Sequence, residues 1–486
     1  MPHKLLSRRS FIQRGHTYNG PISASIVIDG DSRNTGGYLG PQWWELLRDD
    51  DYRNAPLMRW TDKASGGQTI TQCTSDVVST VCSTTVCPHD TWLPYSRRVL
   101  IIWMGVNDMR TEHVTGATAF SRLQTYLQTV SAKKIYHHII VLLQIPTTTK
   151  DGLPLNADLA TFNSTITTNW GNDGASDIRA SGATSYIDLP ALYPGIFDDF
   201  TDYTGSFNNT DYYILNDKVH LTEKGRQLVA DAVRDHLETL DLTHLPFRAE
   251  GVLAWLQWDK GITYGNSTYV NTWKDRLNSH RWLQGTESAQ PTVDSSGQQI
   301  NFDADSLYLL NTYRGRNIFQ NCAGMGFSVN MSSDVVVSGA DDDWVFQFST
   351  GPSSSNYRLG LRLQNSVIQM RVRADDADSG TAAQGGSYSA GEKFNVTGYV
   401  DVNDIATTGA YVNKNGTLLQ KITSGYTGGS GVKTSDTASN RANIGAVGTS
   451  VYFDGKCPEM IFFDARHENY IPNTQTYMLN RPWLTT

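Results

Sequence analysis

The chain has 486 residues, which is too long for one hydrophobic core, so it should fold as two or three domains. Hydrophobic residues make up 39% and charged residues 18%, the composition of a water-soluble globular protein. The net charge of −8 argues against nucleic acid as a partner, because that binding needs a basic surface. No apolar run approaches the roughly 18 residues needed to span a bilayer.

The first 22 residues predict a basic arm. Within it, Ser7-Arg8-Arg9-Ser10 resembles the core of a twin-arginine export signal. Such a signal continues into an apolar segment, yet residues 14–20 are polar, so we expect no export signal. The arm is either a loosely held terminus or an attachment to a larger assembly.

Between residue 24 and about residue 240, short apolar runs alternate with helical patterns. The runs are continuous, as in parallel strands buried on both faces, at 26–28, 99–103, 139–143 and 186–189. Apolar residues with helical spacing lie between or after them, at 120–130, 159–170 and 228–237, the last with Thr222 as N-cap. This alternation predicts a doubly wound α/β domain with a parallel sheet, whose ligand site lies beyond the carboxyl ends of the strands.

The pattern changes near residue 245, where helical spacing gives way to a period of two. Leu359, Leu361 and Leu363, for example, alternate with polar residues or glycine. Half-buried strands of this kind build all-β antiparallel sandwiches. We therefore expect three parts: the arm at 1–22, an α/β domain at 23–245 and a β-sandwich at 246–486, with the boundary within 243–250.

The sequence Gly30-Asp31-Ser32 directly follows the first strand run, and a helix is expected around 43–47. A serine at the carboxyl end of a strand can be exposed beside backbone N–H groups, which suits a nucleophile. Read alone, these letters describe an ordinary turn equally well.

Two further motifs point to the same edge of the sheet. In Ser65-Gly66-Gly67-Gln68, paired glycines allow the backbone to approach a ligand closely, although a simple loop looks the same. In Gly105-Val106-Asn107-Asp108, the amide of Asn107 follows a strand and can donate to an oxyanion, although a turn asparagine is the alternative.

The fourth motif, Asp217-Lys218-Val219-His220, precedes the last helix of the α/β domain. An aspartate three residues before a histidine can hold one imidazole nitrogen and leave the other to act as a general base. A single histidine at a helix start is more often structural, but this one follows three motifs in order.

In this order, the four motifs resemble those of the SGNH (GDSL-type) hydrolase superfamily over residues 24–240. The resemblance implies a flavodoxin-like α/β fold with Ser32 as nucleophile, His220 as base and Asp217 orienting the histidine. It also implies three oxyanion donors: the backbone N–H groups of Ser32 and Gly67 and the side-chain amide of Asn107. It implies no metal and no other cofactor.

Two details of the resemblance are open. Gly66 is adjacent to Gly67 and is an alternative donor. Arg33 stands where the superfamily commonly has leucine, and we expect this difference to bear on substrate contacts rather than on chemistry. Members of the superfamily cleave esters and thioesters, including carbohydrate O-acetyl groups, lipids and acyl-CoA.

The second half resembles the concanavalin A-like (laminin-G-like, jelly-roll) sandwich. The motifs that carry this resemblance are Ala254-Trp255-Leu256, Trp273-Lys274-Asp275, Gln290-Pro291-Thr292, Phe302-Asp303, and Gly455 before Met460-Ile461-Phe462-Phe463. Many such domains bind glycans and others are purely structural.

Other residues in this half have two interpretations. Four tryptophans are candidates to stack on sugars, with core packing the favoured alternative: Trp255, Trp258, Trp273 and Trp282. Asp341-Asp342-Asp343 is a candidate calcium loop, with a solvated loop favoured. The five cysteines contain no Cys-x-x-Cys pair, so no zinc site is expected, while a local disulfide among Cys73, Cys82 and Cys87 stays open.

The sequence thus favours a serine esterase, most of all a carbohydrate O-acetylesterase acting on a surface polysaccharide. An acetylated glycan is the expected partner, and an extracellular or virion-associated location fits a tailspike or capsid spike, as a single chain or a homo-oligomer. The alternatives are a lipase or thioesterase, and a virion or surface attachment protein that binds glycan with little catalysis. The glycan, the acyl group and the oligomeric state are not predicted by any of these residues.

Overall fold

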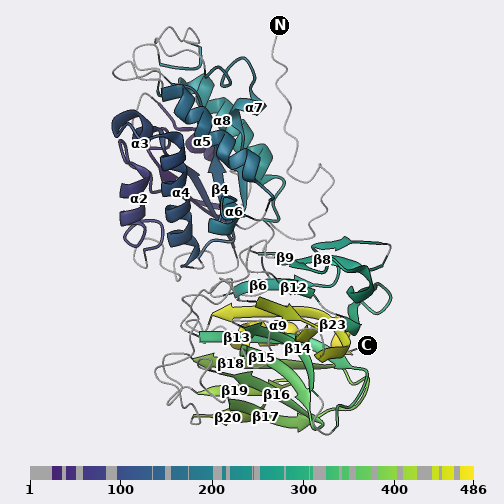
Figure 1. Ribbon diagram of the computed structural model, residues 1–486. Coiled ribbons are helices and arrows are strands. Elements are labelled where there is room, and N and C mark those ends of the chain that lie inside the picture. Colours follow the sequence, from purple (N-terminus) through teal and green to yellow (C-terminus); the bar gives the residue numbers. More distant parts are fainter. Residues whose placement is uncertain are drawn as a thin grey trace. The chain divides into compact units, whose positions relative to one another are not determined.

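The computed structural model divides into two compact units, Met1–Ala249 and Glu250–Thr486 (Figure 1). It describes residues 24–35, 40–50, 58–83, 96–133, 135–147, 155–172, 174–200, 211–214, 219–242, 245, 252–266, 268–277, 281–305, 307–309, 324–338, 342–349, 357–373, 381–401, 409–423, 441–447, 451–464 and 471–485. The expected arm at 1–22 and the predicted site residue Asp217 lie outside these ranges.

A parallel five-stranded sheet forms the centre of the first unit, in the order β2-β1-β3-β4-β5. Its strands are β1 (Ala24–Gly30), β2 (Met58–Asp62), β3 (Arg97–Trp103), β4 (His138–Leu142) and β5 (Ser185–Ile187). Every residue of β1, β3 and β4 is buried, as the continuous apolar runs predict. The order is that of doubly wound α/β proteins, so the prediction of an α/β domain is confirmed.

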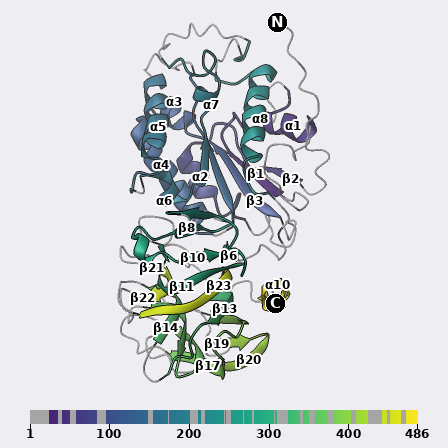
Figure 2. The same ribbon diagram turned by 90° about the vertical axis from the view of Figure 1, so that its right-hand side faces the viewer.

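Helices cover both faces of this sheet (Figure 2). One face packs against α2 (Ile70–Asp76), α4 (Gly116–Ser131) and α5 (Leu155–Asn169), and the other against α1 (Trp43–Asp50) and α8 (Glu223–Leu237). Along β3, Leu100 and Ile102 belong to the first core, whereas Val99 and Ile101 belong to the second. Side chains on successive strand residues point to opposite faces, which explains why the whole strand must be apolar.

Three short helices complete the described part of this unit: α3 (Val106–Thr111), α6 (Ile178–Ser181) and α7 (Leu189–Leu192). The strand predicted at 186–189 ends earlier than expected, at Ile187. Asp188 accepts a hydrogen bond from the Ala191 N–H at 3.1 Å, so it caps α7 and Leu189 becomes helical.

Two antiparallel nine-stranded sheets make up the second unit. One sheet contains β6 (Val252–Gln257), β10 (Thr292–Asp294), β11 (Gln299–Asp305), β13 (Gly324–Ser333), β18 (Phe394–Asp401), β19 (Ala410–Lys414), β20 (Thr417–Ile422), β22 (Ala446–Val447) and β23 (Val451–Asp464). The other contains β7 (Ile262–Tyr264), β8 (Val270–Lys274), β9 (Arg281–Leu283), β12 (Leu307–Leu309), β14 (Asp342–Ser349), β15 (Tyr357–Gln364), β16 (Val367–Val372), β17 (Thr381–Ser387) and β21 (Arg441–Ile444). Three short helical segments accompany them, η2 (Glu287–Ala289), α9 (Ile471–Leu479) and α10 (Pro482–Thr485).

Residues from both sheets form one hydrophobic core, so the prediction of an antiparallel β-sandwich is confirmed. Leu359, Leu361 and Leu363 of β15 are fully buried in this core, as their period of two indicates.

Core packing also explains most of the tryptophans considered as sugar platforms. Trp255, Trp273 and Trp282 are at most 2% exposed, and Trp258 is partly buried against the core. Trp273 and Trp282 belong to the hydrophobic core, as the favoured interpretation expected, whereas Trp255 is buried beside Glu459 and Tyr477. In the candidate calcium loop, Asp342 pairs with Arg362 at 2.6 Å, whereas Asp341 lies outside the described residues.

Within the described ranges, no helix combines the length and the apolar character that a membrane crossing requires. Cys73 and Cys457 are buried free thiols, and Cys87 and Cys322 lie outside the described ranges. Cys73 therefore takes no part in a local disulfide.

Candidate active site

The turn that carries Ser32 follows β1 directly and is held in a conformation that requires glycine. Gly30 has a φ of +136°, and a Cβ at this position would lie 2.1 Å from the carbonyl oxygen of Trp103. The Asp31 N–H donates to the same carbonyl at 3.3 Å, and the Asp31 side chain accepts from the Arg33 N–H at 3.0 Å. The chain therefore turns sharply at the end of the strand, as the motif predicts, and the Ser32 side chain is half-buried.

Buried side chains support this turn from within the domain. Asn34 is fully buried, and its amide donates to the backbone oxygen of Asp29 at 2.7 Å. The indole N–H groups of Trp43 and Trp44 in α1 donate to the Asn34 side chain and backbone oxygens, both at 2.9 Å. These contacts fix the position of Ser32 because they leave the turn few alternative conformations.

His220 lies beside Ser32, with its Nε2 2.7 Å from the Ser32 Oγ. The histidine stands on a loop that an antiparallel bridge between Tyr213 and Leu221 holds in place. Thr222 then caps α8 by accepting from the Gly225 N–H, as the sequence predicts. The structure thus joins two residues 188 positions apart in the chain at hydrogen-bonding distance.

Gly66 and Gly67 follow β2, and Gly66 lies near the nucleophile. An ideal Cβ on Gly66 would lie 3.8 Å from the Ser32 Cβ, whereas one on Gly67, at a φ of +79°, would meet nothing within 4 Å. Both glycines are exposed. A side chain at position 66 would therefore stand next to the nucleophile, while one at position 67 would point into open space.

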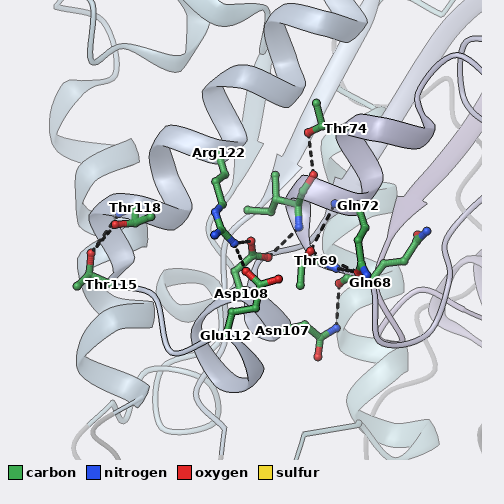
Figure 3. Close-up of polar contacts among 11 residues, drawn as sticks. Gln68, Thr69, Gln72, Thr74, Asn107, Asp108, Glu112, Thr115, Thr118 and Arg122 are labelled. Atoms are coloured by element: carbon green, nitrogen blue, oxygen red, sulfur yellow. Dashed lines mark hydrogen bonds and ion pairs between the residues drawn. The ribbon is translucent and has the colours of Figure 1, made fainter.

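The predicted oxyanion donors are free to act. Within the described residues, no hydrogen bond uses the backbone N–H of Ser32 or of Gly67. Asn107 is buried, and its Nδ2 donates to the Gln68 backbone oxygen at 3.0 Å (Figure 3). An amide nitrogen carries two hydrogens, so this bond orients the group and leaves one N–H for a ligand.

Two carboxyl groups near the start of the turn have perturbed protonation. Burial raises the pKa of Asp31 to about 6, against the opposing effect of the Arg33 and His220 charges. Its Oδ2 has no hydrogen-bond partner in the described structure. Burial also raises the pKa of Asp29 to about 7, and the hydroxyl of Tyr126, which donates to Asp29, opposes this rise. Both groups can thus change their charge near neutral pH.

The expectation for Arg33 is wrong. Arg33 is only 4% exposed, and its guanidinium donates to the side-chain oxygen of Gln144 at 3.0 Å and lies 5.3 Å from the centre of the Trp103 ring. Burial of the long side chain along these partners stabilises the turn from beneath. Arg33 is therefore a supporting residue and not a surface for substrate.

The first unit contains a second serine–histidine contact that no sequence motif indicates. The Oγ of Ser185 in β5 lies 2.7 Å from the Nε2 of His236 in the last turn of α8. Burial lowers the pKa of His236 to about 4. This imidazole is therefore neutral at physiological pH.

Where the structure describes the chain, no three or more His, Cys, Asp and Glu side chains are grouped to hold a metal ion. The chemistry that the described site offers is that of a serine hydroxyl next to an imidazole. The partnership of Asp217 with His220 stays a prediction, because Asp217 is outside the described residues.

Comparisons with known proteins do not identify a family. No protein-family model and no curated protein matches the chain. Among solved structures, the binding domain of botulinum neurotoxin serotype C1 is 12% identical over 48% of this chain and 52% of that one, with a TM-score of 0.32. A Trypanosoma rangeli sialidase is 13% identical over 54% of this chain and 42% of that one, with a TM-score of 0.35. The chain thus spans about half the length of these structures, and similarity at this level supports no conclusion about its activity.

Proposed function

We propose that the first unit is a serine esterase of the SGNH type. The observation that carries the proposal is the 2.7 Å contact between Ser32 Oγ and His220 Nε2, and no hydrogen bond among the described residues uses the backbone N–H of Ser32 or Gly67. The nucleophile follows β1, Gly67 follows β2, Asn107 lies at the start of α3 directly after β3, and the base lies before α8. Loops at this edge of a doubly wound sheet are where such proteins place their ligands.

The proposed reaction proceeds in two steps. His220 Nε2 takes the proton from Ser32 Oγ as the oxygen attacks the acyl carbonyl, and the resulting oxyanion accepts hydrogen bonds from Ser32, Gly67 and Asn107. His220 then gives this proton to the departing alcohol oxygen, which leaves an acyl group on Ser32. In the second step His220 takes a proton from water as the water oxygen attacks the acyl-enzyme. His220 then returns this proton to the departing Ser32 oxygen, which releases the acid and restores free Ser32.

The proposed substrate is an O-acetyl ester on a polysaccharide. The sequence resemblance supports this substrate class, and the exposed Gly66-Gly67 loop leaves room beside Ser32 for a bulky alcohol. The β-sandwich would then bind the polymer and raise the local concentration of acetyl groups near the site. A role in a tailspike or capsid spike, outside the cell, belongs to the same proposal.

The test is acetate release from p-nitrophenyl acetate and from acetylated and chemically deacetylated capsular polysaccharides. We expect the wild-type chain to release acetate from p-nitrophenyl acetate and from the acetylated polysaccharide, and Ser32→Ala to release it from neither. The deacetylated polysaccharide is the blank. Ser164→Ala is the matched control, because Ser164 is an exposed serine on α5 and its loss should change nothing.

Three outcomes would count against parts of the proposal. Turnover by Ser32→Ala would remove Ser32 as the nucleophile. Faster cleavage of p-nitrophenyl palmitate or of an acyl-CoA than of any acetylated glycan would favour the lipase or thioesterase alternative. Polysaccharide binding without ester cleavage by the wild-type chain would favour an attachment protein.

A further inference from the structure

Asp108 connects the two segments that carry the proposed oxyanion donors. It follows Asn107 in α3 and is fully buried. Its Oδ2 accepts a hydrogen bond from the backbone N–H of Ile70 at 2.8 Å. Ile70 is the first residue of α2, and an N–H in the first turn of a helix has no partner within that helix. Asp108 thus satisfies a donor that the segment after Gly67 would otherwise bury unpaired.

Adjacent residues therefore hold the same short segment at two points (Figure 3). Asn107 donates to the Gln68 carbonyl at 3.0 Å, and Asp108 accepts from the Ile70 N–H two residues further on. The first bond sets the direction of the Asn107 amide. The second bond ties Ile70 to Asp108. It therefore holds residues 68–70, which directly follow Gly67, against the start of α3.

Arg122 provides the charge that a buried carboxylate needs. It reaches from α4, and its Nη1 lies 2.8 Å from the Asp108 Oδ1. Burial raises the pKa of Asp108, and the Arg122 guanidinium and the Ile70 N–H oppose this rise. Arg122 also pairs with Glu112, whose side chain is 39% exposed. Of these two ion pairs, only Arg122–Asp108 involves a residue that also contacts the segment after Gly67.

We propose that Asp108 and Arg122 are positioning residues that set the spacing between the Asn107 amide and the Gly67 N–H. The inference rests on the esterase function proposed above. Neither residue touches substrate, but oxyanion donors act only within about 2.7–3.1 Å of the developing charge. A displacement of about 1 Å in such a group costs on the order of 10²-fold in rate.

The experiment measures kcat and KM on p-nitrophenyl acetate for Asp108→Asn, Asn107→Ala and the double variant. We expect Asp108→Asn to lower kcat by about 10- to 100-fold, with KM changed less than about threefold, since the loss affects the transition state. In the Asn107→Ala background the same substitution should cost less, because one of the two donors whose spacing it sets is already absent.

The control variants separate positioning from folding. Arg122→Gln removes the countercharge of Asp108 and should lower kcat, whereas Arg122→Lys should recover part of it. Glu112→Gln breaks only the exposed ion pair and should keep wild-type kcat. Thermal unfolding of each variant shows how much folded protein is assayed, and Arg122→Gln replaces Asp108→Asn should the latter fail to fold.

The outcomes distinguish this inference from the function on which it rests. An inactive wild-type chain contradicts the esterase and the positioning role together. An active wild-type chain in which the losses of Asp108→Asn and Asn107→Ala simply multiply contradicts the positioning role alone. So does an equal loss for Glu112→Gln and Arg122→Gln.

Discussion

The described part of the first unit contains two serine–histidine pairs with the same 2.7 Å separation, Ser32–His220 and Ser185–His236. Their surroundings differ. Ser32 lies on a turn after β1 beside the exposed Gly66, whereas Ser185 lies within the sheet, in register with Ile140. His220 stands on a loop before α8, and His236 is part of that helix.

This difference shows that the distance between a serine and a histidine does not by itself define a nucleophile. A reacting serine also needs space for an acyl group and donors for the oxyanion. Ser32 has an open glycine loop and the Asn107 amide on the adjacent segment. In the second pair, the half-buried and neutral His236 is suited to hold α8 against β5.

The largest expected effect separates the two histidines. His220→Ala should lower kcat on p-nitrophenyl acetate by on the order of 10⁴–10⁶-fold, as for other bases of activated serines. His236→Ala should change kcat per folded molecule less than about twofold. Comparable losses in both variants would mean that the second pair takes part in the reaction or in the shape of the site.

A smaller loss is expected from the oxyanion donor. Asn107→Ala should reduce kcat by about 10²–10³-fold with little change in KM, because one preorganised donor is removed. Steady-state kinetics on the same ester checks this prediction. A loss below about threefold would show that Asn107 does not face the oxyanion.

The two glycines should respond differently to alanine. In Gly66→Ala the new methyl group lies beside Ser32, so we expect a several-fold higher KM for bulky esters and unchanged stability. In Gly67→Ala the φ of +79° is unfavourable for alanine, so we expect a loss of about 1–2 kcal/mol in the free energy of unfolding. Kinetics combined with urea unfolding tests both, and the reverse pattern would exchange the roles of the two positions.

The smallest effect concerns stability and pH. Because burial lowers the pKa of His236 to about 4, the unfolded chain binds a proton there more readily than the folded chain between about pH 6.5 and 4. The free energy of unfolding should therefore fall as the pH falls through this range, and less steeply in His236→Gln. Urea unfolding at several pH values measures the slopes, and equal slopes would contradict a lowered pKa for His236.

Much of the first unit follows from local patterns. Apolar runs and helical spacing predict β1, β3, β4, α4, α5 and α8. A strand buried on both faces is apolar throughout, and a helix buried on one face has apolar residues at helical spacing. The motif containing Asn107 and Asp108 was also visible. That Asp108 pairs with Arg122 was not, since an arginine on an exposed helix face is common and its partner depends on how the helices pack.

Contacts between distant residues account for the other differences. Arg33 follows the proposed nucleophile and was expected near substrate. Its buried guanidinium instead donates a hydrogen bond to Gln144, which is 111 residues away in the chain. In the sandwich, the period of two predicts strands but not that β6 pairs with β23 from the other end of the unit. Such pairings depend on the whole set of strands and leave no local pattern.

The most direct measurement is to locate the reactive serine. A fluorophosphonate probe forms a stable adduct only with a serine that a neighbouring base activates and oxyanion donors surround. The account predicts one labelled peptide, carrying the adduct on Ser32, and its loss in His220→Ala but not in His236→Ala. Labelling of Ser185, or no labelling of the folded wild-type chain, would contradict the claim that Ser32 and His220 form the catalytic pair.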